Sequence, residues 1–225
     1  MKKSLTTRSR ILDEGLALAS QSGLEGVTLG VLADHVGMSK SGLFAHFRSK
    51  DAVQIAVLEE MTRVVEPLVV APAMRAPAGL PRLRALVGQW FGWSRRAGLP
   101  GGCPVAAGMF EYDDVASPVR EKVETLECEW RALLSRLVAD AVRCGHFDAN
   151  LDVEQFVWEL CGIYLSHHIS ARFLKSADAN RRAIAAFDAL VARATPARHR
   201  AVPRTRSAGA RAGKTARARR RTKNR

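Results

Sequence analysis

The stretch TLGVLADHVGMSKSGLFAHFRSK at residues 28–50 has the pattern of two short helices joined by a tight turn. Thr28 is a favourable N-cap for a helix over residues 29–35, because its hydroxyl can accept a hydrogen bond from a free backbone N–H group in the first turn. Gly37 can end that helix, since glycine tolerates the left-handed conformation of a sharp exit. Ser39 can then cap a second helix over residues 40–46. Two short helices separated by about three or four residues are typical of a helix-turn-helix.

Both of these expected helices have one apolar face. Helical spacing places Leu29, Leu32, Ala33 and Val36 together on the first helix, and Leu43, Phe44 and Phe47 together on the second. The other side of the second helix carries Lys40, Ser41, Ala45 and His46. Side chains that are small or polar allow a helix to approach DNA closely and offer donors to base edges. The stretch therefore predicts a DNA-binding protein.

With these motifs, residues 5–53 resemble the DNA-binding domain of the tetracycline-repressor (TetR) family of bacterial transcriptional regulators. The similarity lies in the threonine start, the small-residue turn and the ending formed by Phe44, His46, Phe47, Ser49 and Lys50. The family usually has Tyr at the position of Phe44, so a phosphate contact through that hydroxyl is missing here. The alternative is an ordinary helical hairpin inside a helical enzyme. The resemblance implies a homodimeric, all-helical repressor that binds a double-stranded operator and senses a small-molecule inducer.

The expected DNA contacts fall into two groups. Lys40, Ser41 and His46 are predicted to face base edges from the outer side of the second helix. Thr28, Ser39 and Lys50 lie at helix starts, where an anion is favoured, and are predicted to face phosphate. Gly42 and Phe44 complete the predicted DNA-binding set.

The excess positive charge is concentrated at the end of the chain. The 225 residues carry a formal net charge of +13, but residues 198–225 hold 12 Lys or Arg and no acid, which leaves 23 bases against 22 acids in the rest. This segment has few large apolar residues, so we expect a disordered tail at residues 196–225. We expect it to bind DNA without sequence preference; a solubilising extension is the alternative. A nucleoid-associated protein dominated by this tail is the rival function.

Other classes of protein find little support in the sequence. There is no CxxC pair, no apparent secretory signal and no apolar run of about 18 residues, so we expect a cytoplasmic, nucleoid-associated protein without a membrane span. The Gly101–Gly102 pair lacks the Lys–Ser/Thr ending of a P-loop, and no GxSxG or HExxH motif occurs. Consecutive residues on a helix face about 100° apart, which disfavours a metal site at His167 and His168. We expect no enzyme activity, cofactor or metal.

The remaining sequence predicts further helices and no strand. A first helix should run from Thr7 to Ser22, and a fourth should start at Ser49 and end near Pro67. The proline-rich run at residues 67–81 is expected to be a connection, followed by a helix that stops near Gly98. Later helices should span residues 118–144, start at Asp152 with a capping box to Gln155, and run from Asp178 to Pro196. The predicted class is all-α, with domains at residues 1–52 and 53–195 ahead of the tail.

The second domain is predicted to bind a ligand and to form the dimer. Aromatic and sulfur-containing residues gather between the DNA-binding domain and the last two helices, where the family has its inducer pocket; a plain aromatic core is the alternative. The expected ligand-binding residues are Trp90, Trp93, Cys103, Met109, Phe110 and Trp130, with a redox role of Cys103 as a less favoured alternative. The last two helices are apolar on more than one face, which predicts dimerisation through Phe156, Leu160, Tyr164, Phe187 and Val191.

Overall fold

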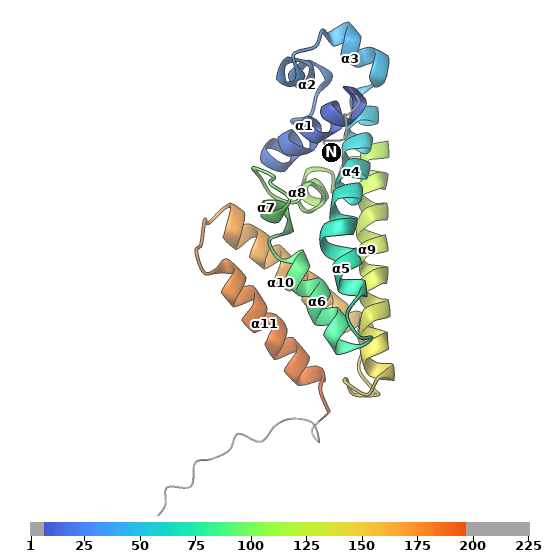
Figure 1. The fold of residues 1–225 in the computed structure, drawn as a ribbon, viewed down its shortest axis with the longest axis vertical. Helices are drawn as coiled ribbons and strands as arrows, with labels where there is room; N and C mark the ends of the chain where they lie inside the picture. The colour runs from blue at the N-terminus through green and yellow to red at the C-terminus, as the bar shows by residue number, and fades with distance from the viewer. Residues whose placement is uncertain (1–6, 197–225) are drawn as a thin grey trace, which may run out of the picture.

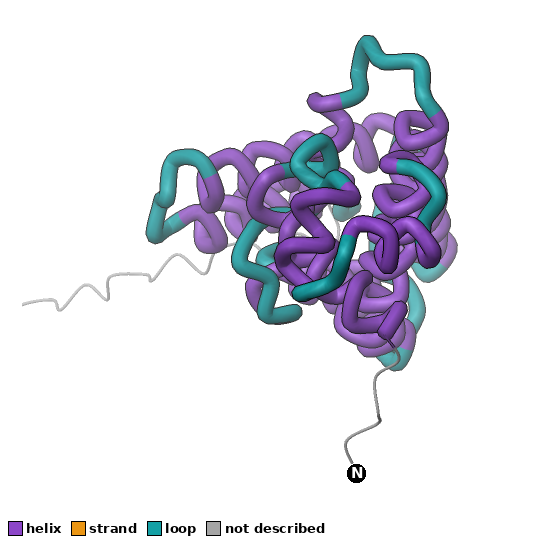
Figure 2. The backbone as a smooth tube through the Cα atoms, turned by 90° about the horizontal axis from the view of Figure 1, so that it is seen from above, coloured by secondary structure: helices purple, strands orange, loops and turns teal. Residues whose placement is uncertain are grey.

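Helix α4 (Lys50–Val65) runs along the long axis of the molecule and joins its two parts (Figure 1). The computed structural model describes residues 7–196. Before α4 lie α1 (Thr7–Ser22), α2 (Leu29–Val36) and α3 (Lys40–His46); after it follow the π-helical turn η1 (Glu66–Val70), α5 (Ala71–Met74), α6 (Leu80–Trp90), α7 (Trp93–Arg96), α8 (Pro104–Glu111), α9 (Pro118–Arg143), α10 (Val153–Arg172) and α11 (Ala179–Ala194). Figure 2 shows only helices and loops over the described residues, which confirms the predicted all-α class.

Helices α1 to α3 form a small bundle at one end of the molecule (Figure 1). Its centre is made of large apolar side chains from all three helices, among them the fully buried Ile11, Leu32 and Leu43. Truncating one such leucine to alanine costs about 2–5 kcal/mol, because the transfer free energy is lost and a cavity remains. The bundle packs on α4 through α1.

The predicted caps of the helix-turn-helix are present. The Thr28 hydroxyl accepts from Val31 N at 3.2 Å, and the Ser39 hydroxyl accepts from Gly42 N at 3.1 Å. Gly37 has φ 67°, the left-handed conformation in which it ends α2. Ser49 caps α4 in the same way by accepting from Ala52 N at 3.0 Å. These short-range bonds fix where α2, α3 and α4 begin and where α2 ends.

The expected connection over residues 67–81 is largely helical, so this prediction was wrong. The π-helical turn η1 and helix α5 continue α4 as far as Met74, and only residues 75–79 form a loop. Pro67 and Pro72 each occupy the first turn of their helical segment. Each proline lacks the N–H that would bond to the preceding turn, and the π-helical turn η1 is where the helix accommodates this loss.

The helix expected to stop near Gly98 ends earlier, at Trp90. Gly92 adopts φ 72°, which turns the chain before the short helix α7. Helix α8 was not predicted; it begins directly after the Gly101–Gly102–Cys103 turn, with Pro104 in its first turn. The turn itself passes very close to α1, since a Cβ on Gly101 would lie 1.7 Å from Ser20 O. Gly101 is therefore required for this packing.

The three long C-terminal helices start almost where the sequence predicts. Ser117 caps α9 by accepting from Arg120 N at 3.1 Å, and Asp152 caps α10 by accepting from Gln155 N at 3.0 Å. The predicted capping box is only half formed: the Gln155 side chain does not accept from the Asp152 N–H, and its amide donates to Glu159. Helices α10 and α11 pack side by side, and α10, which passes behind α6 in Figure 1, also packs on α9.

The predicted basic tail lies outside the described residues. Within residues 7–196, no helix is long and apolar enough to cross a membrane.

Candidate DNA-binding surface and ligand cavity

Helix α3 presents its polar side chains to solvent. Lys40, Ser41 and His46 are exposed, whereas Leu43 is fully buried beneath them. The backbone of Gly42 is only half-buried. The predicted base-contacting residues therefore share one accessible surface.

Phe44 lies on that surface as well. The apolar spacing placed it on the inner face beside Leu43 and Phe47, but 53% of its surface is exposed, while Phe47 is 3% exposed. The inner face of so short a helix is too narrow to bury all three side chains. Phe44 is thus an exposed ring next to the polar side chains of α3.

The residues predicted to face phosphate have partners within the protein. Thr28 and Ser39 act as caps, and the Ser39 hydroxyl also lies 3.1 Å from that of Ser41. Lys50 Nζ lies 2.5 Å from Glu25 Oε2 on the loop between α1 and α2. This lysine, together with Tyr112, lowers the pKa of the Glu25 carboxyl. A phosphate contact by Lys50 requires it to exchange this carboxylate for DNA.

Two arginines of α1 that the sequence did not single out hold the helix-turn-helix in place. Arg8 donates to His46 O at 3.2 Å and places its guanidinium 4.5 Å from the centre of the Phe47 ring. Arg10 donates to Val36 O at 3.4 Å. Both contacts are made to the carboxyl end of a recognition-motif helix, where a cation is favoured.

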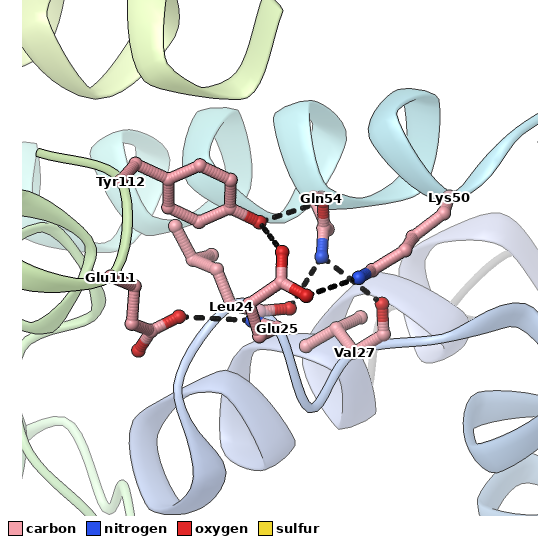
Figure 3. A network of polar contacts seen from close by, with 7 residues as sticks. All are labelled: Leu24, Glu25, Val27, Lys50, Gln54, Glu111 and Tyr112. Atoms are coloured by element: carbon pink, nitrogen blue, oxygen red, sulfur yellow. Dashed lines mark hydrogen bonds and ion pairs between the residues drawn. The ribbon is translucent and has the colours of Figure 1, made fainter. Parts of the chain in front are cut away.

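A polar network connects the helix-turn-helix to the second domain (Figure 3). The fully buried Gln54 of α4 donates from Nε2 to Leu24 O at 2.6 Å, and its Oε1 lies 3.2 Å from the hydroxyl of Tyr112. The same hydroxyl donates to Glu25, and Glu111 accepts from the backbone N–H of Glu25 at 2.9 Å. Burial and the neighbouring Glu25 raise the pKa of Tyr112, so the hydroxyl keeps its proton. The end of α8 is therefore bonded to the loop that precedes α2.

An apolar cavity of about 340 Å³ lies in the second domain. Helix α4 contributes Met61, Thr62 and Val65 to its lining, and α6 to α10 supply most of the rest. Of the six residues predicted to bind a ligand, five line this cavity: Trp90, Trp93, Cys103, Met109 and Trp130. The sixth, Phe110, lies outside the lining and is 62% exposed, because the next residue along a helix faces about 100° away.

The aromatic rings of the cavity are packed against one another. Trp90 stacks on Tyr164 with centroids 4.2 Å apart, and Trp130 meets Trp90 edge-on at 5.0 Å. Trp93 donates from Nε1 to the Tyr164 hydroxyl at 3.3 Å. Trp130 Nε1 is buried and has no hydrogen-bond partner among the described residues.

Two cysteines line the same cavity. Burial raises the pKa of the Cys103 thiol, and burial raises the pKa of Cys161 to about 11. A thiol is the poorly reactive form of cysteine, since the thiolate is the nucleophile. The environment of Cys103 therefore opposes the redox role considered from the sequence.

The five side chains predicted to form the dimer interface point inward. Phe156, Leu160, Tyr164, Phe187 and Val191 are between 0% and 8% exposed within the single chain. The sequence shows that α10 and α11 are apolar on more than one face but does not show which face covers the chain's own core. The exposed large apolar residues of this region are Trp158, Ile169, Phe173, Leu174 and Ile184.

His167 of α10 already has side-chain partners. His167 Nε2 lies 2.6 Å from Asn180 Oδ1, and its ring stacks on Phe91 with centroids 5.3 Å apart. Within residues 7–196, no three side chains of His, Cys, Asp or Glu are grouped so as to hold a metal ion.

A capped helix-turn-helix that is bonded to a helical domain with an apolar cavity defines a helix-turn-helix transcriptional regulator. Residues 11–57 match the model of bacterial regulatory proteins of the tetR family, and residues 79–187 match the tetracyclin repressor-like C-terminal domain. The chain belongs to the TetR family of transcriptional regulators. No curated protein matches the sequence.

Solved structures of transcriptional regulators share the fold. A TetR-family regulator from Cytophaga hutchinsonii has a TM-score of 0.74 at 19% identity, over 86% of this chain and 98% of the other. One from Chloroflexus aurantiacus has a TM-score of 0.72 at 23% identity, over 82% and 92%. The transcriptional regulator FadR from Bacillus subtilis, solved in complex with stearoyl-CoA, has a TM-score of 0.67 at 14% identity, over 82% and 98%.

Proposed function

We propose that this regulator is a homodimeric repressor that acts in the cytoplasm, binds a palindromic operator through α3, and is released by a small apolar ligand. One observation carries the proposal: α4 takes part in both sites. Its first turns hold the helix-turn-helix through Lys50 and Gln54, and its last turns line the cavity through Met61, Thr62 and Val65. A ligand that shifts α4 therefore also shifts the DNA-binding helices.

The lining indicates the kind of ligand. The cavity of about 340 Å³ is within the usual size range of small-molecule sites, and most of its wall is apolar or aromatic. Trp130 Nε1 offers an unused donor, so a hydrogen-bond acceptor on the ligand is favoured. The FadR regulator from Bacillus subtilis, which has a similar fold, was solved with the acyl thioester stearoyl-CoA. We therefore favour a largely apolar ligand that carries a carbonyl or ether oxygen.

We place the dimer interface on the outward face of α10 and α11. Trp158 is 66% exposed and Phe173 82% exposed, and Ile169 lies between them on α10. Leaving such large apolar side chains in water is unfavourable for an isolated chain, and a two-fold dimer can bury the same surface on both copies. Two copies also place two α3 helices at successive major grooves, about 34–36 Å apart.

DNA binding is tested by fluorescence anisotropy with a labelled fragment taken from upstream of the gene. We expect His46→Ala and Lys40→Ala each to lower the affinity for this fragment by at least about tenfold more than the affinity for random DNA, since a good base contact contributes about 1–3 kcal/mol. Lys122→Ala is the control, because this lysine of α9 makes only a long ion pair, 3.5 Å to Glu59; it should leave both affinities unchanged. Equal losses on both DNAs for the α3 variants would rule out base reading by α3.

Ligand release is tested with apolar compounds selected by their effect on thermal stability. Ala106 lines the cavity and is 1% exposed, so Ala106→Phe should fill part of the space and reduce the stabilisation that such compounds give. A compound that binds the wild type but not this variant should lower operator affinity by about 5–150-fold. Operator affinity that does not change with a cavity-bound compound would contradict the proposed release.

A further inference from the structure

A second cavity of about 320 Å³ lies beside the first. It is formed by α7, the last turns of α10, the loop at residues 173–178 and the start of α11. Trp93 and Tyr164 line both cavities and form the wall between them. The proposed repressor mechanism makes no use of this second space.

The lining of the second cavity is basic. It includes Arg95, Arg172 and Lys175 together with His167 and His168, and no Asp or Glu is among the residues that line it. The pKa of His168 is lowered, first by burial and then by the positive charge of Arg172 and by His167. The groups around the cavity thus disfavour a further positive charge.

The carboxylate that lies nearby in the sequence is already neutralised. Asp178 follows the lining residue Ala177, but its oxygens bind the Ser176 hydroxyl at 2.7 Å and the side chains of Arg181 at 2.6 Å and Arg182 at 2.9 Å. The negative charge of Asp178 is therefore balanced by Arg181 and Arg182, which do not line the cavity. The cations of the cavity therefore lack an internal counter-ion.

The cavity cations themselves have few protein partners. Over the described part of the chain, neither Arg95 nor Lys175 forms an ion pair or a side-chain hydrogen bond. Arg172 makes only two long bonds to backbone carbonyls, to Pro100 O at 3.4 Å and Ser20 O at 3.5 Å. Arginine is a planar donor suited to bidentate binding of carboxylate or phosphate oxygens. These three side chains therefore have N–H groups that are free to bind a ligand.

A buried nitrogen provides independent support for a ligand. His167 lines the cavity and is only 6% exposed, its Nε2 is bonded to Asn180, and its Nδ1 has no partner among the described residues. Because Nε2 donates to the Asn180 oxygen, the neutral ring has Nδ1 as an acceptor, which a hydroxyl of the ligand, such as the P–OH group of hydrogen phosphate, can satisfy.

The backbone of Lys175 has an unusual conformation. Its φ of 53° is positive, and it is the only non-glycine residue with positive φ in residues 7–196. A lysine is less favourable than a glycine in this conformation, and the loop nevertheless holds this cationic residue in the lining of the cavity.

We propose that this second cavity is a binding site for a small oxyanion, a phosphate or carboxylate group, held by Arg95, Arg172 and Lys175. The anion would replace carbonyl contacts of Arg172 with a charge-assisted pair and would give the exposed Arg95 and Lys175 a common partner. The volume fits a small molecule or the anionic part of a larger one.

The test is isothermal titration of the full chain with sodium phosphate and, separately, with sodium acetate, at constant ionic strength. The variant Arg95→Gln/Lys175→Gln removes two exposed cations and should leave the thermal stability without anion unchanged. The matched control Arg120→Gln/Lys122→Gln removes two cations from α9 and lowers the net charge equally. Residues 198–225, with their 12 bases, are present in every variant, so their binding cancels in the comparison.

We expect one saturable site per chain whose affinity falls at least about tenfold in the cavity variant and less than about twofold in the control, because charge-assisted hydrogen bonds are the strong ones. Loss for phosphate alone identifies a phosphate ligand, loss for acetate alone a carboxylate, and loss for both a general oxyanion site. Equal loss in the two double variants, or no saturable binding to the wild type, would overturn the proposal.

Discussion

The substitution Gln54→Met probes the network that joins α4 to the helix-turn-helix. Methionine keeps nearly the same length and volume but removes every hydrogen bond of a fully buried amide. The lost bonds run to Leu24 O at 2.6 Å, to Val27 O at 3.4 Å and to the Tyr112 hydroxyl at 3.2 Å. Leaving a buried acceptor without its donor costs about 1–3 kcal/mol.

The expected total lies near the middle of that range. Leu24 O keeps a second donor, Val27 N at 2.9 Å, and the Tyr112 hydroxyl keeps Glu25 as its acceptor. Val27 O loses the donor that Gln54 supplies, but that bond is long. We therefore expect Gln54→Met to reduce the free energy of unfolding by about 2 kcal/mol, and Tyr112→Phe, which removes one hydroxyl, by about 1 kcal/mol.

The assay is urea unfolding followed by circular dichroism at one chain concentration, because dimer stability depends on concentration. Hydrogen exchange of the α2 and α3 amides provides a local readout and should be faster in Gln54→Met. A variant that is as stable as the wild type within about 0.5 kcal/mol would show that the amide contributes no net stability and would refute this reasoning.

Three other perturbations are informative. Glu25→Gln frees Lys50 from its carboxylate partner, so affinity for operator and random DNA should both rise by up to about tenfold at low salt, as measured by anisotropy; an unchanged affinity would mean that Lys50 does not reach phosphate. At pH 8, iodoacetamide should label the exposed Cys128 at least about tenfold faster than Cys161, whose pKa of about 11 keeps it a thiol, and mass spectrometry showing equal rates would contradict the burial. Trp158→Glu should give monomers in light scattering, and a stable dimer would move the interface elsewhere.

The helix-turn-helix could be predicted because its determinants are local. Thr28, Ser39 and Ser49 each bond a backbone N–H three residues ahead, so their role follows from spacing alone. The cavity was predicted in part for a different reason, since ligand pockets and cores use the same aromatic residues. Trp90 and Trp130 do line it, whereas Phe110 is an aromatic residue on the face of α8 that points away from the cavity.

The remaining features depend on tertiary packing. Tyr112 meets Glu25 across 87 positions of sequence and Gln54 across 58, and none of the three belongs to a motif. The sequence also does not show which apolar face of α10 turns inward, so Tyr164 was predicted at an interface although it stacks on Trp90 in the core. Pro67 was expected to end the helix, because the sequence does not show that α4 continues through the π-helical turn η1.

In vitro selection of random duplex DNA by the purified full chain tests the central claim most directly, because it needs neither the operator nor the inducer to be identified. We expect an enriched inverted repeat whose half-sites are about 34–36 Å apart, centre to centre. Lys40→Ala should change the preferred base in each half-site, while Lys122→Ala should select the same sequence as the wild type. Enrichment of no sequence, or of the same sequence by both variants, would contradict a dimer that reads DNA through α3.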